Sequence, residues 1–123
     1  MGFHRLKTLV LGASENPMRY SYKAANMLTE KGHDIFLVGK QKGKFLDKII
    51  EIDFSDASDI HTVTLYLNAI NQEKYYQNIL DLKPQRVIFN PGTENPEFQE
   101  ILDENNINWT EACTLVLLST NQF

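Results

Sequence analysis

The residues best suited to do chemistry in this sequence lie in the segment Gly12-Ala13-Ser14-Glu15-Asn16-Pro17, between a short apolar run and a helical pattern. Glycine permits a close approach of the backbone to a ligand, and the amides before a helix start can receive a phosphate. Ser14 adds a hydroxyl group, and Arg19 adds a planar fork of donors that suits phosphate oxygens. The segment therefore predicts a phosphate-binding loop. The alternative is an ordinary strand-to-helix turn with a solvated Arg19.

A group of lysines follows the next apolar run, which ends in Gly39-Lys40 and continues with Lys42 and Lys44. A dinucleotide fingerprint would need G-x-G-x-x-G in the first loop and an acidic residue after the second strand, and both are missing. Simple NAD binding is therefore disfavoured, whereas positive charge here suits the additional phosphate of NADP or coenzyme A. The alternative is that these lysines only keep a loop solvated.

The remaining candidates for catalysis or metal binding are weak. His4, His33 and His61 show no metal-ligand spacing with Cys113, so the sequence favours neither a metal site nor a catalytic residue. Ser14 lacks the second glycine of the G-x-S-x-G nucleophile elbow. Cys113 adjoins an apolar run and is expected to be a buried structural thiol. The alternative places Cys113 at the carboxyl edge of the sheet, where it could form a mixed disulfide with a ligand thiol.

Strand and helix patterns alternate along the chain, at intervals that fit one domain over residues 1–123. The expected strands cover residues 9–11, 35–38, a half-exposed stretch 50–54, 63–67, 87–89 and a last strand beginning at 107–109. The expected helices cover residues 22–31 with Ser21 as N-cap and Gly32 past the end, a segment from an Asn71 cap to before Pro84, and a segment from an Asn95 cap with Pro96 first.

This alternation predicts an α/β fold with a doubly wound, mostly parallel sheet. Such sheets bind ligands outside the carboxyl ends of the strands, at the point where the winding reverses. That rule points to residues 12–19 and 67–71 as the binding region.

The composition fits a single globular domain, with 123 residues of which 42% are hydrophobic and 23% charged. A net charge of -4 argues against a general nucleic-acid binder. Residues 1–44 hold eight basic and three acidic side chains (+5), whereas residues 45–123 hold four and thirteen (-9), so an anionic ligand is expected on the first third. One cysteine, no signal segment and no apolar run of membrane length predict a cytoplasmic protein that does not bind membranes.

The chain resembles the small stand-alone CoA-binding proteins, whose Rossmann-like domain is similar to the CoA-binding domain of the succinyl-CoA synthetase alpha subunit. The resemblance rests on Val10-Leu11-Gly12-Ala13-Ser14 with Asn16-Pro17 and Arg19, on Leu37-Val38-Gly39, on Pro91-Gly92 and on Glu111-Ala112-Cys113. The family pattern usually has Asn-Pro in place of Gly39-Lys40, and a proline-containing turn in place of Leu67-Asn68-Ala69. The resemblance implies a Rossmann-like fold and these ligand-binding residues: Gly12, Ala13, Ser14, Asn16, Pro17, Arg19, Gly39, Lys40, Leu67, Asn68, Pro91 and Gly92.

The resemblance also implies that the chain binds coenzyme A or an acyl-CoA through its Gly-Ala-Ser loop, without chemistry of its own. The alternatives are a minimal NADP-dependent enzyme and an interaction domain that has lost its ligand. A small nucleotide ligand is the expected partner, and the sequence points to no protein partner.

Overall fold

Seven strands form one sheet in the computed structural model, which describes residues 5–123. The strands are β1 (Thr8–Leu11), β2 (Ile35–Val38), β3 (Gly43–Phe45), β4 (Lys48–Glu51), β5 (Thr62–Leu65), β6 (Arg86–Phe89) and β7 (Asn108–Glu111). Their order across the sheet is β3-β4-β2-β1-β5-β6-β7, and every neighbouring pair is parallel except β3 and β4. The predicted α/β fold with a mostly parallel sheet is confirmed.

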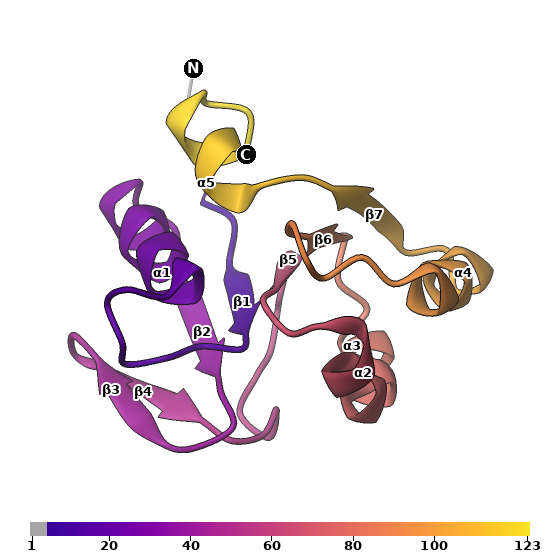
Figure 1. Cartoon of the computed structure of the whole chain (residues 1–123), viewed down its shortest axis with the longest axis horizontal. Coiled ribbons are helices and arrows are strands. Elements are labelled where there is room, and N and C mark those ends of the chain that lie inside the picture. Colours follow the sequence, from indigo (N-terminus) through magenta and orange to yellow (C-terminus); the bar gives the residue numbers. More distant parts are fainter. Residues whose placement is uncertain (1–4) are drawn as a thin grey trace.

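Helices cover both faces of this sheet (Figure 1). One face carries α1 (Tyr20–Glu30) and α5 (Thr114–Ser119), and the other carries α2 (Ala69–Gln72), the 3-10 turn Glu73–Tyr75, α3 (Tyr76–Leu82) and α4 (Pro96–Glu104). Leu28 of α1 and Leu118 of α5 pack on the first face, while Phe98 and Leu102 of α4 pack on the second. Central strands of a parallel sheet must be apolar on both faces for this reason. None of the helices within residues 5–123 is long and apolar enough to cross a bilayer.

The winding of the sheet reverses at β1. Strand β2 lies on one side of β1, with Val10 opposite Leu37, and β5 lies on the other side, with Val10 opposite Thr64. The loops that leave the carboxyl ends of β1 and β5 therefore diverge to opposite faces, which leaves a crevice between them. The predicted binding region thus coincides with the switch point of the sheet.

The start of α1 differs from the prediction, because Ser21 is not its N-cap. Arg19 occupies the N-cap position with an extended backbone (φ -79°, ψ 144°), and Ser21 is the second helical residue and is buried. The side-chain oxygen of Asn16 accepts a hydrogen bond from the Met18 amide, and its carbonyl accepts one from the Arg19 amide, so the turn is formed before Ser21 is reached. The predicted helix end is confirmed, since Gly32 follows Lys31 with φ 84°.

The N-cap of α2 is Asn68 and not Asn71. The Asn68 side chain accepts a hydrogen bond from the Asn71 amide at 3.0 Å, so the first asparagine after β5 starts the helix. The predicted end before Pro84 is confirmed, because α3 stops at Leu82. The Asn95 cap of α4 is also confirmed, with its side chain accepting from the Phe98 amide at 3.1 Å.

The strand expected at residues 50–54 is wrong beyond Glu51. Ile50 packs on the α1 face, Ile52 is half exposed and Phe54 packs on the opposite face, so the three side chains do not share one side. The Asp53 carboxylate accepts a hydrogen bond from the Ser55 amide, which turns the chain there.

Two elements have no counterpart in the sequence prediction: strand β3, which forms a hairpin with β4, and helix α5. The hairpin turns at Leu46, whose φ of 53° is a left-handed conformation that hairpin turns usually assign to Asn or Gly. The α5 segment reads Thr-Leu-Val-Leu-Leu-Ser, in which polar residues do not recur at a helical spacing. Strand β5 also ends at Leu65, two residues earlier than expected.

Candidate functional site

A pocket of about 760 Å³ opens at the carboxyl ends of β1, β2, β5 and β6. Ten of the expected ligand-binding residues line it: Gly12, Ala13, Ser14, Asn16, Arg19, Lys40, Leu67, Asn68, Pro91 and Gly92. Pro17 and Gly39 do not. The rest of the wall comes from Glu15, Met18, Tyr20, Ser21, Gln41, Lys42, Ile50, Tyr66 and Thr93. The switch point thus gathers residues that are up to 81 positions apart in sequence (12 to 93).

The first loop, which connects β1 to α1, lies against the end of β2. The amides of Gly12 and Ala13 both donate to the carbonyl oxygen of Val38, at 2.8 and 2.9 Å. Gly39 permits this contact, because a Cβ there would lie 2.5 Å from the Ala13 carbonyl oxygen. These two amides are therefore already hydrogen-bonded within the fold and cannot receive a phosphate, contrary to the expectation for the start of the loop.

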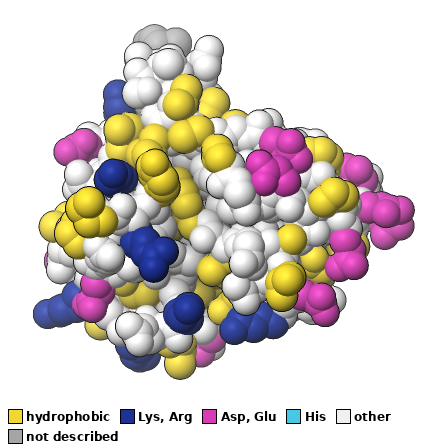
Figure 2. All heavy atoms as spheres, in the orientation of Figure 1, with side chains coloured by type: hydrophobic (Ala, Val, Ile, Leu, Met, Phe, Trp, Pro, Cys, Tyr) yellow, Lys and Arg dark blue, Asp and Glu magenta, His cyan; other side chains and the backbone are white. Residues whose placement is uncertain are grey.

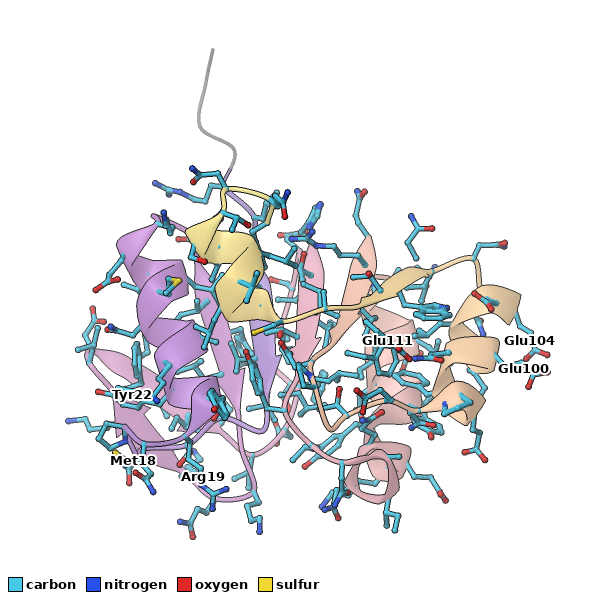
Figure 3. The ribbon with its side chains drawn as sticks, turned by 45° about the horizontal axis from the view of Figure 1, so that its top comes forward. Met18, Arg19, Tyr22, Glu100, Glu104 and Glu111 are labelled. Atoms are coloured by element: carbon cyan, nitrogen blue, oxygen red, sulfur yellow. The ribbon has the colours of Figure 1, made fainter. Side chains whose placement is uncertain are left out.

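Free donors occur further along, where the loop meets α1. The amides of Tyr20 and Ser21 have no acceptor within the described part of the chain, as is usual for the first turn of a helix. Arg19 is exposed beside them, and no carboxylate of residues 5–123 forms an ion pair with it. Figure 3 shows Met18 and Arg19 at the end of α1 that adjoins this loop. The helix start and the guanidinium together favour an anion in this part of the pocket.

Lysines form the part of the pocket wall that follows β2 in the chain. Lys40 and Lys42 line the wall, and Lys42 also forms an ion pair with Glu51 of β4 at 3.8 Å. On the face drawn in Figure 2, most Lys and Arg side chains lie on the left, over α1 and the hairpin, and most Asp and Glu side chains lie on the right, over α4. The uneven charge of the sequence is therefore also an uneven charge in space.

Tyr66 forms part of the pocket wall and was not expected from the sequence. Burial raises the pKa of the Tyr66 hydroxyl to about 12, although hydrogen bonding with Thr114 and Thr64 acts in the opposite direction. The phenol is therefore protonated at neutral pH and can donate a hydrogen bond. It offers no base for proton abstraction.

A buried glutamine joins the loops that follow β5 and β6. The Gln72 side chain is fully buried, and its amide nitrogen donates to the carbonyl oxygens of Leu67 and Thr93, both at 2.8 Å. Its amide oxygen accepts from Asn95 at 2.9 Å. Since both loops line the pocket, Gln72 fixes the width of the pocket between them.

Asn90 connects the same edge of the sheet to α5. Its side-chain nitrogen donates to the Thr64 hydroxyl at 2.7 Å and to the Leu65 carbonyl at 2.9 Å, and its oxygen accepts from the Thr114 amide at 2.8 Å. Every donor and acceptor of this buried amide has a partner, so Asn90 holds the start of α5 rigidly against the end of β5.

Cys113 lies at the carboxyl edge, immediately before α5, as one of the two sequence interpretations placed it. It is partly exposed rather than buried, which corrects the expectation of a fully buried thiol. It does not line the pocket. The mixed disulfide with a ligand thiol stays a prediction.

The two described histidines lie away from the pocket, at the amino edge of the sheet. His61 directly precedes β5, and His33 lies between α1 and β2. Burial first, and the charge of Arg86 second, lower the pKa of both imidazoles, while Asp34 partly counteracts this at His33. Among residues 5–123, no three His, Cys, Asp or Glu side chains lie close enough to hold a metal ion.

We expect the folded chain to lose stability as the pH falls from about 7.5 to about 5.5, below the ordinary histidine pKa. Because the folded pKa values of His33 and His61 are lowered, the unfolded chain binds more protons in this window, so acid favours unfolding. Urea denaturation at the two pH values measures the effect. In the double variant His33→Gln and His61→Gln the pH dependence should shrink. A slope that the double variant leaves unchanged would assign it to other groups.

Comparison with known proteins shows the family to which the chain belongs. The family model for the CoA binding domain matches residues 7–119. The chain belongs to this family of CoA-binding domains. A search among curated proteins found no match.

Solved structures agree with this CoA-binding domain in fold. It is similar to a crystal structure of an uncharacterized protein, with 49% identity over 98% of this chain and 100% of the other, and a TM-score of 0.95. It also resembles a protein from Thermus thermophilus (20% identity, covering 97% and 91%, TM-score 0.86) and a hypothetical protein from Pyrococcus horikoshii (21%, covering 94% and 83%, TM-score 0.87). The two distant structures show that the Rossmann-like fold persists at low sequence identity.

Proposed function

We propose that this chain binds coenzyme A or an acyl-CoA in the pocket at the switch point, as a binding domain without chemistry of its own. The observation that carries the proposal is that the matched CoA-binding domain has a pocket of about 760 Å³ at the switch point, whose wall holds Arg19, Lys40 and Lys42. The pyrophosphate would lie at the start of α1, where the Tyr20 and Ser21 amides and Arg19 face it.

Two observations favour binding over catalysis. The wall contains a tyrosine that burial keeps protonated, and both described histidines lie at the opposite edge of the sheet. The lysine-bearing wall would also accept the ribose phosphate of NADP, so NADP is the ligand to compare with CoA.

Thermal unfolding of the chain with CoA, NADP or ADP tests the proposal. A ligand present at about 100 times its Kd should add about 2.7 kcal/mol to the free energy of unfolding. We expect the largest rise in Tm with CoA. A larger rise with NADP would favour the enzyme alternative, and no rise with any of the three would favour an interaction domain that has lost its ligand.

Calorimetric titration of the Arg19→Ala variant tests where the phosphates lie. Loss of one charge-assisted hydrogen bond to phosphate should weaken CoA binding by about 1.5 kcal/mol or more, at least tenfold in Kd. Arg5→Ala is a matched control, because Arg5 is exposed at the amino edge and pairs with Asp34 at 3.9 Å. Equal affinities of the two variants would remove Arg19 from the site.

A further inference from the structure

Glu15 connects the first loop to the β3–β4 hairpin, two segments that are distant in sequence. Its carboxylate oxygen Oε2 accepts a hydrogen bond from the backbone amide of Lys44 at 2.7 Å. Strand β3 is the last strand of the sheet on this side, so the Lys44 amide points away from β4 to the open edge. The Glu15 carboxylate therefore takes the place that a further strand would have.

The hairpin is shaped to receive this side chain. A Cβ at Gly43 would lie 2.7 Å from both Cγ and Cδ of Glu15, so the glutamate lies directly against the glycine backbone. Gly43 has no positive φ, and its backbone would tolerate alanine. The contact with Glu15, rather than the local backbone conformation, accounts for the absence of a side chain here.

The charge of Glu15 is unfavourable for the proposed ligand. Its neighbours in the pocket wall include Arg19, Lys40 and Lys42, which favour an anion, whereas a carboxylate in the same wall repels one. The segment that carries Lys40 and Lys42 leads directly into β3, the strand that Glu15 holds. By holding β3, Glu15 also holds Lys40 and Lys42 in the pocket wall, and this positioning offsets the repulsion.

We propose that Glu15 is a positioning residue, which holds the β3–β4 hairpin and its lysines against the first loop while its charge weakens the binding of anionic ligands. The part of this inference that concerns the ligand rests on the proposed CoA binding. The part that concerns the hairpin does not.

Three variants of the full chain separate the hydrogen bond from the charge. Glu15→Gln keeps an acceptor oxygen and removes the charge. Glu15→Ala removes both, and Gly43→Ala keeps the carboxylate but displaces it from its seat on the glycine. Glu104→Ala, on α4 and at the opposite end of the molecule from Arg19 in Figure 3, is a control for the change in net charge.

Amide hydrogen exchange measured by NMR without ligand tests the link to the hairpin. We expect exchange at Lys44 to rise about tenfold in Glu15→Ala and in Gly43→Ala, and to stay near the original rate in Glu15→Gln and Glu104→Ala. Equal exchange in Glu15→Ala and the unmodified chain would overturn the proposal. So would a Glu15→Gln variant that exchanges as fast as Glu15→Ala, because the conservative variant must rescue a positioning role.

Titration with CoA at two salt concentrations tests the effect on the ligand. At an ionic strength of about 0.5 M charge repulsion is largely screened, so Glu15→Gln and the control Glu104→Ala should bind like the unmodified chain. Glu15→Ala and Gly43→Ala should bind about fivefold more weakly. At about 0.05 M, Glu15→Gln should bind several-fold more tightly than the unmodified chain. Unchanged affinity in all variants would overturn the role in ligand binding. An unmodified chain that binds no CoA would overturn the proposed function, while the exchange rates would still decide whether Glu15 holds the hairpin.

Discussion

The Gly12→Ala variant should lose about 3 kcal/mol or more of its free energy of unfolding, through backbone strain and overpacking together. Gly12 has φ 99°, a conformation that alanine adopts only at a cost. A Cβ at this position would also lie 3.0 Å from both the carbonyl carbon and the oxygen of Tyr66. These are backbone atoms directly after β5, so they have little freedom to move. Urea denaturation followed by circular dichroism measures the loss.

Gly92→Ala provides a matched control for this loss. Gly92 has a similar φ of 91°, but a Cβ there would meet no atom within 4 Å. Its variant should lose only the strain of the backbone, about 1 kcal/mol. Equal losses at the two glycines would show that the contact with Tyr66 has no energetic weight.

The same contact changes the interpretation of the first loop. The sequence suggests that Gly12 is small so that a ligand can approach, in which case substitution should harm binding more than stability. The structure places the Tyr66 backbone on the side where the Cβ would point, and the Gly12 amide is already bonded to Val38. We therefore expect substitution of Gly12 to reduce stability and binding together.

Features of the fold that depend on neighbouring residues were predictable from the sequence. The apolar run that became β1, the Gly32 end of α1 and the Asn95-Pro96 start of α4 each follow from local chemistry. The hairpin was not predictable, because its turn places Leu46 at positive φ, where the sequence gives no signal. Its formation depends on contacts such as that between Glu15 and Lys44, which are far apart along the chain.

Some residues of the candidate site were likewise predictable from the sequence, and others were not. Residues in the loops that leave the carboxyl ends of strands, such as Ser14, Lys40 and Pro91, were predictable because these ends meet at one edge of a parallel sheet. Tyr66 and Gln72 were not, since the first resembles any core aromatic residue and the second any polar residue of a helix. Only the folded chain shows that Gln72 is buried between two loops and has its amide fully bonded.

Asn90→Leu should lower the free energy of unfolding by about 3 kcal/mol. Leucine is similar in size to asparagine but cannot form any of the hydrogen bonds that the buried Asn90 amide makes. The Asn90 amide makes three hydrogen bonds and is 2% exposed. Its removal leaves the Leu65 carbonyl and the Thr114 amide without this partner in the interior. Because Thr114 is the first residue of α5, this helix should separate from the sheet earlier than the other elements. Urea denaturation measures the total loss.

Amide hydrogen exchange along α5 distinguishes local release of this helix from destabilisation of the whole domain. If Asn90 fixes α5, exchange in Thr114–Ser119 should rise more than exchange in α4, which Asn90 does not bond. Asn78→Leu is a matched control, because Asn78 is exposed on α3, and it should change stability by less than about 0.5 kcal/mol. A uniform rise in exchange across the Asn90→Leu variant would mean that the amide stabilises the whole sheet edge and not α5 in particular. Since Thr64 and Thr114 are close enough to Tyr66 to influence its pKa, either outcome should also alter the pocket wall and weaken CoA binding.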